Sequence, residues 1–149
     1  MKFLKVYGSH KDFYAMCKNL ENFQYNLMPI LKEKGYNLTE DLQDIVGYVL
    51  YIDDKPIGSI GIKKVSNVIC EIVRVFICDE HRGKGYAKLL FEKIETLAKE
   101  MGYKQAEMVA WCKADAAVNL YKNLGYKCTE EKESEWFAGL KYVEFFKNY

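Results

Sequence analysis

The sequence contains few of the residues that build metal sites and disulfide frameworks. It has only two histidines, His10 and His81, and these lie far apart along the chain. Its five cysteines include no C-x-x-C pair and are odd in number, so the pattern favours neither a zinc site nor a set of disulfides. We therefore expect no metal site, and we expect free thiols of the kind found in the reducing cytoplasm.

A strong charge of one sign and a long apolar run are also missing. The net charge is +1 with both signs interspersed, which argues against nucleic acid or an anionic membrane as an obligate partner. No segment approaches the roughly 20 apolar residues of a membrane span, and the N-terminus lacks the apolar stretch of a signal peptide. Half of the 149 residues are hydrophobic, so we expect one soluble domain, residues 1–149, with a packed core.

The clearest pattern that is present lies between residues 68 and 101. Residues 68–78 are mostly β-branched or aromatic and are apolar on both faces, which is typical of a strand inside a sheet. From Ala87 to Met101 the apolar residues follow helical spacing, and Gly102 provides a stop. The pattern predicts a buried strand, a turn and a long helix.

The turn between this strand and this helix has the features of a phosphate site. Gly83 and Gly85 lie where the helix begins and its first N–H groups are unpaired, and Arg82 and Lys84 add positive charge. No Walker A motif is present, and Lys88 stands where a Rossmann fingerprint needs glycine or alanine. We infer a phosphate or pyrophosphate cradle of another kind.

The remaining segments complete a mixed α/β pattern. We expect one helix that begins after Ser9 and a second that begins near Thr39. The other expected elements are strands at 2–7, 46–52, 56–63 and 106–112, a helix at 114–124 and a β-hairpin within 126–149. This order predicts a sheet with helices on its faces.

Three motifs resemble those of the GNAT acetyltransferase superfamily. They are Arg82-x-x-Gly85-x-Ala87 after the buried strand, Glu71-Ile72-Val73-Arg74-Val75 inside it, and Asn119-Leu120-Tyr121-Lys122-Asn123-Leu124-Gly125-Tyr126 further on. The resemblance implies a GNAT-type fold, in which a mixed and mostly antiparallel sheet of about seven strands carries helices on both faces. One departure is Ala114, because many members have an asparagine at this place.

The same resemblance implies an enzyme that transfers acetyl from its cosubstrate acetyl-CoA to a primary amine of a small molecule or peptide within a ternary complex. The cofactor would contact the strand end and the turn, at Phe76, Ile77, Cys78, Arg82, Gly83, Lys84, Gly85, Tyr86 and Ala87. Backbone N–H groups near Ile77 would stabilise the thioester carbonyl oxygen. Family members often dimerise, so a homodimer is an open alternative.

Glu71 is the candidate general base. It alternates in phase with Val73, Val75 and Ile77, which predicts an apolar face where burial raises the carboxyl pKa above its usual value of about 4.3. An acceptor ammonium must lose a proton before its nitrogen attacks, and in the family a glutamate on this strand often receives it. The alternative is a structural Glu71 paired with a lysine of a neighbouring strand. Arg74 is expected on the opposite face as a structural cation.

Tyr121 is the candidate general acid. The family context makes its phenol the donor that protonates the departing CoA thiolate, and the usual pKa values of a phenol and a thiol, about 10 and 8.5, are close enough for that transfer. The alternative is a core aromatic on the inner stripe of its helix.

Other functions for the whole chain also stay open. A different acyl group, a non-catalytic acyl-CoA sensor or interaction module, and a nucleotide-phosphate binder are each compatible with the same turn. The acceptor is not identified by any motif. Residues 14–45 and 133–142 are expected to build its pocket, and their acidic side chains permit a cationic amine: Glu21, Asp41, Asp44 and Glu135.

Overall fold

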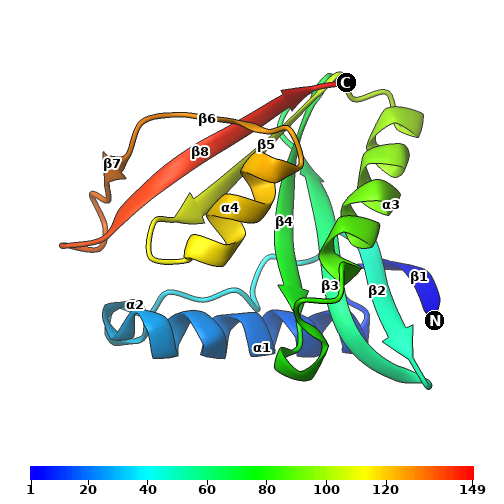
Figure 1. Cartoon of the computed structure of the whole chain (residues 1–149), viewed down its shortest axis with the longest axis horizontal. Coiled ribbons are helices and arrows are strands. Elements are labelled where there is room, and N and C mark those ends of the chain that lie inside the picture. Colours follow the sequence, from blue (N-terminus) through cyan, green and yellow to red (C-terminus); the bar gives the residue numbers. More distant parts are fainter.

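The computed structural model describes residues 1–149 as one mixed α/β unit. Its sheet has the strand order β1-β2-β3-β4-β5-β8-β6, with β7 also paired to β8. Every pairing is antiparallel except that of β4 with β5, so the predicted GNAT-type arrangement is confirmed (Figure 1). In chain order the elements are β1 (Lys2–Tyr7), α1 (Lys11–Leu27), α2 (Pro29–Glu33), β2 (Val46–Ile52), β3 (Lys55–Lys64), β4 (Ile69–Ile77), the 3₁₀ turn η1 (Asp79–His81), α3 (Tyr86–Glu100), β5 (Gln105–Trp111), α4 (Asp115–Asn123), β6 (Lys127–Cys128), β7 (Lys132–Glu133) and β8 (Lys141–Asn148).

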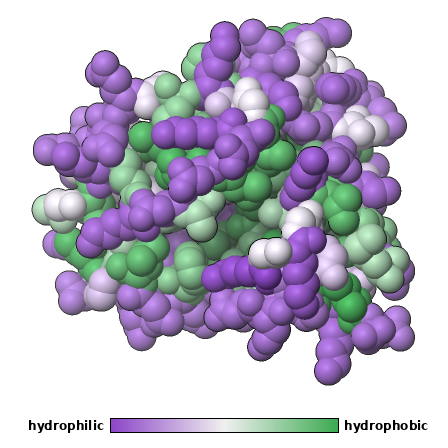
Figure 2. Space-filling view, in the orientation of Figure 1, coloured by the Kyte–Doolittle hydropathy of each residue, from purple (hydrophilic) through white to green (hydrophobic).

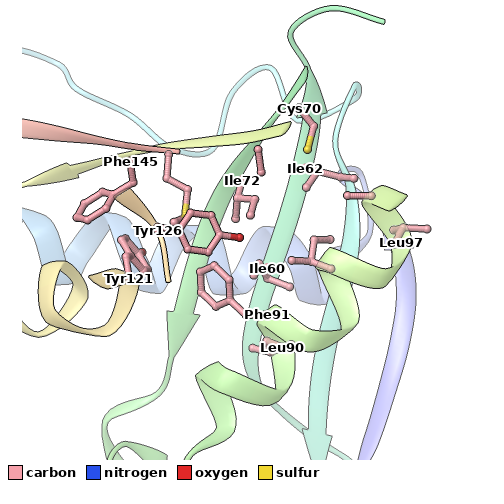
Figure 3. Close-up of a cluster of buried hydrophobic side chains, with 14 of the residues drawn as sticks. Ile60, Ile62, Cys70, Ile72, Leu90, Phe91, Leu97, Tyr121, Tyr126 and Phe145 are labelled. Atoms are coloured by element: carbon pink, nitrogen blue, oxygen red, sulfur yellow. The ribbon is translucent and has the colours of Figure 1, made fainter. Parts of the chain in front are cut away.

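The sheet buries a hydrophobic core on each face. On one face α3 and α4 pack against the sheet through residues such as Leu90, Phe91 and Tyr121 (Figure 3). On the other face α1 contributes Phe13 and Cys17, both fully buried. Helices therefore cover both faces, as expected.

The sheet has eight strands rather than about seven because the first arm of the C-terminal hairpin is broken. Residues 127–128 and 132–133 form the separate short strands β6 and β7, and both pair antiparallel with β8. The hairpin itself is as predicted. The β2–β3 hairpin also forms, and its turn residues Asp53 and Asp54 both have positive φ, as a tight two-residue turn requires.

The helix predicted from near Thr39 is wrong. Residues 34–45 form no helix, although Asn37 Oδ1 accepts from the Thr39 and Glu40 N–H groups as a helix N-cap would. Side chains from distant residues hold the segment instead: Glu21 Oε2 accepts the Leu38 N–H at 2.8 Å, and Arg74 Nε donates to the Leu38 carbonyl. The second helix of the structure, α2, lies earlier in the chain, at Pro29–Glu33.

The first helix has a different N-cap from the one predicted. His10, not Ser9, is the N-cap of α1, and its Nδ1 accepts the Asp12 N–H. The helix runs unbroken to Leu27, and Pro29 then occupies the first position of α2, where its missing N–H costs nothing.

Strands β4 and β5 separate soon after they begin. They pair only over Ile69–Glu71 and Gln105–Glu107, and Figure 1 shows them diverging beyond that point. A bulge in β4 accompanies the separation: Arg74 has a φ of 58°, and the register with β3 shifts between Ser59 and Gly61. The buried Ser59 hydroxyl donates to the Arg74 carbonyl at 2.8 Å and so fixes the bulge.

The bulge corrects the predicted phase of β4. Glu71 shares the α1 face with Val73, but Val75 and Ile77 pack on the α3 face and not beside Glu71. Arg74 was expected on the face opposite Glu71, and instead its Nε donates to the Leu38 carbonyl at 3.0 Å on the α1 side. One extra residue in the strand accounts for both differences.

A polar cluster fixes β8 to the helices. The buried Tyr126 hydroxyl donates to Glu95 Oε2 of α3 at 2.7 Å, and Lys147 of β8 pairs with the same oxygen at 3.1 Å. The hydroxyl of Tyr149 lies 3.2 Å from that of Tyr126. The C-terminal strand is thus tied to α3 by hydrogen bonds as well as by packing.

Tyr126→Phe tests this cluster. The substitution keeps the ring and leaves Glu95 with one partner fewer, so we expect the free energy of unfolding to fall by about 1–2 kcal/mol in urea titrations. The control is Tyr7→Phe, because Tyr7 is 69% exposed and its hydroxyl should contribute within about 0.5 kcal/mol. Equal stability of the two variants would contradict the assigned role.

Candidate functional site

A cavity of about 620 Å³ opens where β4 and β5 diverge. Its lining is mostly hydrophobic, and Figure 2 shows a hollow among hydrophobic residues near the centre of this face. The structure brings most of the predicted site residues to this one cavity: Glu71, Phe76, Ile77, Arg82, Gly83, Gly85, Tyr86, Ala87 and Tyr121. Cys78 and Lys84 do not line it, and Lys84 is exposed.

The turn at the start of α3 forms one end of the cavity. Gly85 is the N-cap of α3, with a φ of 82°, and no side chain caps the helix. A Cβ atom at Gly85 would have no protein atom within 4 Å, so open space lies beside this backbone. Unpaired N–H groups with open space beside them suit an anionic ligand such as a pyrophosphate. Lys88, in the first turn of α3, adds a positive side chain that sequence reasoning did not select.

Arg82 is less free to bind phosphate than the sequence suggested. Its Nε donates to the Ile77 carbonyl at 2.9 Å, and a terminal nitrogen lies 2.8 Å from Asp79 Oδ1. Its guanidinium also lies 4.5 Å from the ring centroid of Phe23 in α1. Arg82 therefore links the end of β4 to α1, and only part of its charge is available to a ligand.

Glu71 lies in the middle of the cavity wall, on the α1 face of β4. It stands opposite Lys63 of β3 and Glu107 of β5 in the sheet register, yet it forms no ion pair. Burial raises the pKa of Glu71, and the nearby Glu107 adds to this effect while Lys63 and Arg74 oppose it. Its carboxylate is thus available to a ligand, although a lysine does occupy the facing strand.

Tyr121 lies across the cavity, on α4. Only 7% of it is exposed, and its ring packs edge-on against Phe145 and beside Phe91, with centroids 5.4 and 5.6 Å away (Figure 3). Burial raises the pKa of its phenol above the usual value of about 10, which takes it further from that of a thiol and makes it a weaker proton donor than the sequence suggested. A positioned, protonated phenol at a cavity wall can act as a proton donor.

Ala114 lines the cavity at the N-terminus of α4. No side chain caps this helix, because the N-cap residue Ala114 has no hydrogen-bonding group in its side chain. The first N–H groups of α4 therefore have no side-chain acceptor there.

The α1 end of the cavity lies mainly within residues 14–45, one of the two segments expected to build the acceptor pocket. We use this name for the lining residues Leu20, Phe23, Gln24, Tyr36, Leu38, Arg74 and Trp111. Among these, Gln24 has a buried Oε1 atom without a hydrogen-bond partner. Tyr36 packs edge-on against Trp111, with ring centroids 6.0 Å apart. Residues 133–142, the other segment expected to build the acceptor pocket, do not line this cavity.

Several other candidates lie away from the chemistry. Trp136 is 81% exposed and Tyr14 is also exposed, so neither lines the cavity. Burial raises the pKa of the Cys112 thiol, which disfavours the thiolate that a cysteine nucleophile needs. No group of three or more metal-binding side chains is placed to hold an ion, and none of the helices has the length and apolar character to cross a membrane.

Known proteins are similar to this chain in sequence and in fold. N-acetyltransferase 8 of Rattus norvegicus is 28% identical over 116 residues, which cover 74% of this chain and 49% of the relative. The chain spans about half the length of the curated relatives it matches. A GNAT family acetyltransferase of Elizabethkingia anophelis with acetyl-CoA bound superposes with a TM-score of 0.73 at 14% identity, covering 99% of this chain and 97% of that one.

An aminoglycoside 6'-N-acetyltransferase complexed with coenzyme A has a TM-score of 0.75 at 11% identity, covering 99% of this chain and 97% of the other. At such identities these structures establish a shared fold. The sequence itself matches the acetyltransferase (GNAT) family over residues 12–126, a range that contains β4, the glycine turn and Tyr121. The chain belongs to the acetyltransferase (GNAT) family.

Proposed function

We propose that the protein transfers the acetyl group of acetyl-CoA to a primary amine by direct attack within a ternary complex. One observation carries the proposal: a single cavity joins the glycine turn, the carboxylate of Glu71 and the protonated phenol of Tyr121. Binding, proton removal and proton donation are the three tasks that this reaction requires.

Two ends of the cavity would hold the two substrates. The turn from Arg82 to Ala87 and the α4 wall would bind the cofactor, with its pyrophosphate against the N–H groups at the start of α3. The acceptor would enter at the α1 end. The β4 edge beyond Glu71 has no strand partner on the β5 side, so its N–H groups can support the thioester carbonyl oxygen.

The proton transfers balance across the cavity. Glu71 accepts a proton from the acceptor ammonium, directly or through water, and the freed nitrogen forms a bond to the carbonyl carbon. The carbon–sulfur bond then breaks, and Tyr121 donates its proton to the departing thiolate. The attacking nitrogen releases its second proton to solvent, Glu71 later releases the proton it took, and the Tyr121 phenol takes one proton back. The products are therefore an N-acetyl amine, CoA and one proton.

Gly85→Ala tests the cofactor end. A Cβ at this position would project into the space assigned to pyrophosphate, so we expect the Kd for acetyl-CoA to rise about tenfold or more. Gly102→Ala is the matched control, since Gly102 follows α3 with a φ of 90° and an added Cβ there would also have no neighbour within 4 Å. Both variants should lose similar stability, but only the first should lose affinity. Equal Kd values would contradict the cradle.

Glu71→Gln and Tyr121→Phe test the chemistry. Each removes one proton-transfer group at nearly constant volume, so kcat should fall by about 10² or more while acetyl-CoA affinity changes little. Steady-state kinetics with one acceptor, together with acetyl-CoA titrations, separate the two effects. A variant with unchanged turnover would remove its residue from the mechanism.

The pH dependence gives a second test of Glu71. Its raised pKa means that kcat/KM should fall as the pH drops through a value above the 4.3 of an ordinary glutamate, because the protonated carboxyl accepts no proton. This acid limb should keep its position when the acceptor is changed and should disappear in Glu71→Gln. Persistence of the limb in that variant would assign it to another group.

Two other functions for the same cavity are separable by experiment. Competition among acetyl-, succinyl- and longer acyl-CoA donors would reveal a transferase of a different acyl group. Tight CoA binding without turnover on a broad amine panel would favour a sensor or interaction module, in which Glu71 and Tyr121 are structural.

A further inference from the structure

Arg74 is a half-buried cation that faces the cavity without an ion-pair partner. Its guanidinium has five N–H donors, of which Nε is used by the Leu38 carbonyl at 3.0 Å. It takes part in none of the ion pairs of the structure. A half-buried charge that lacks a counterion is costly, so its retention beside a ligand cavity calls for a partner from outside the chain.

The immediate surroundings compensate the charge of Arg74 only in part, because the Glu71 carboxylate lies near enough for Arg74 to lower its pKa but forms no ion pair with it. The Cys17 thiol beside it is buried, which raises its pKa to about 11 and keeps it neutral. Glu21 already binds the Lys18 ammonium at 3.0 Å and the Leu38 N–H at 2.8 Å. Beyond its contacts with the Leu38 carbonyl and the Cys17 thiol, the guanidinium has further donors that are available to a ligand in the cavity.

The backbone around Arg74 is arranged to present this side chain. A positive φ of 58° is uncommon for an arginine, and the Ser59 hydroxyl holds the bulge in place through the Arg74 carbonyl. Bulges beside active sites redirect side chains, and this one turns Arg74 to the α1 face that also carries Glu71. The α1 side of the cavity thus holds one anion and one cation three positions apart on the same strand.

Apart from Gln24, whose buried Oε1 has no hydrogen-bond partner, the rest of the α1 end is apolar and aromatic. Leu20, Phe23, Tyr36, Leu38 and Trp111 provide the walls. Among all the residues that line the cavity, Glu71 is the only acidic one. Asp41, Asp44 and Glu135 do not line it. A polyamine or another polycation would therefore find one counterion and several buried hydrophobic side chains.

We infer that the acceptor is a free α-amino acid with an apolar side chain, whose carboxylate binds Arg74 while its amino group faces Glu71. This inference rests on the proposed acetyl transfer and gives it a substrate class. Guanidinium and carboxylate match as a bidentate pair, and the apolar side chain would fill the aromatic α1 end. The N-terminal residue of a peptide has an amide in place of the α-carboxylate, so it would offer Arg74 no carboxylate next to its amino group.

The test compares two apolar amino acids with amines that lack the α-carboxylate, and leucinamide and isoamylamine differ from leucine only at that group. L-Leucine and L-phenylalanine should be acetylated with a kcat/KM at least about tenfold above that of leucinamide, of isoamylamine and of spermidine. Leucinamide also stands for a peptide N-terminus. A preference for leucinamide or for spermidine would overturn the inference while leaving acetyl transfer intact.

Arg74→Met and Arg74→Lys assign the preference to this residue. Arg74→Met should raise the KM for L-leucine about tenfold or more and leave the KM for leucinamide within about twofold, with kcat little changed. Arg74→Lys keeps the charge without the planar fork and should give an intermediate KM, and it serves if the methionine variant fails to fold. Equal losses on leucine and leucinamide would show a structural role and contradict the inference. If the unmodified protein does not bind acetyl-CoA, that result would instead refute the proposed function itself.

Discussion

The site depends on the separation of β4 from β5. Paired strands leave no room between them, so the cavity exists only because pairing stops after Glu71. The bulge at Arg74 lies just beyond the last β4–β5 pair. At the bulge, β4 has one more residue than the facing segment of β3. The backbone at the bulge is strained by about 1 kcal/mol or more, and hydrogen bonds from Ser59 and to Leu38 hold it.

The pKa values of Glu71 and Tyr121 differ in what sets them, because the two side chains lie on opposite sides of the sheet. Glu71 lies on the α1 face among charged neighbours, so its pKa is raised but remains balanced by Lys63 and Arg74. Tyr121 lies on the α4 side among aromatic rings, where nothing offsets burial and the phenol keeps its proton. The cavity joins these faces, which allows one group to accept a proton while the other donates one.

The sequence was informative where local patterns decide structure. Helical spacing after Ala87 and the β-rich run before it predicted α3 and β4, and the glycine turn pointed to one end of the cavity. It failed where distant residues decide: the segment after α2 is held by Glu21 and Arg74, which no local pattern reveals. The phase of β4 was wrong because a bulge does not alter residue types, only the face that each residue occupies.

The central claim is that the cavity is an acetyl-CoA site. Calorimetric titration of the protein with acetyl-CoA, run beside CoA and ATP, tests it without knowledge of the acceptor. The account predicts a Kd for acetyl-CoA in the micromolar range, about −8 kcal/mol, with far weaker binding of ATP. Absence of acetyl-CoA binding at millimolar concentration, or tighter binding of ATP, would contradict it.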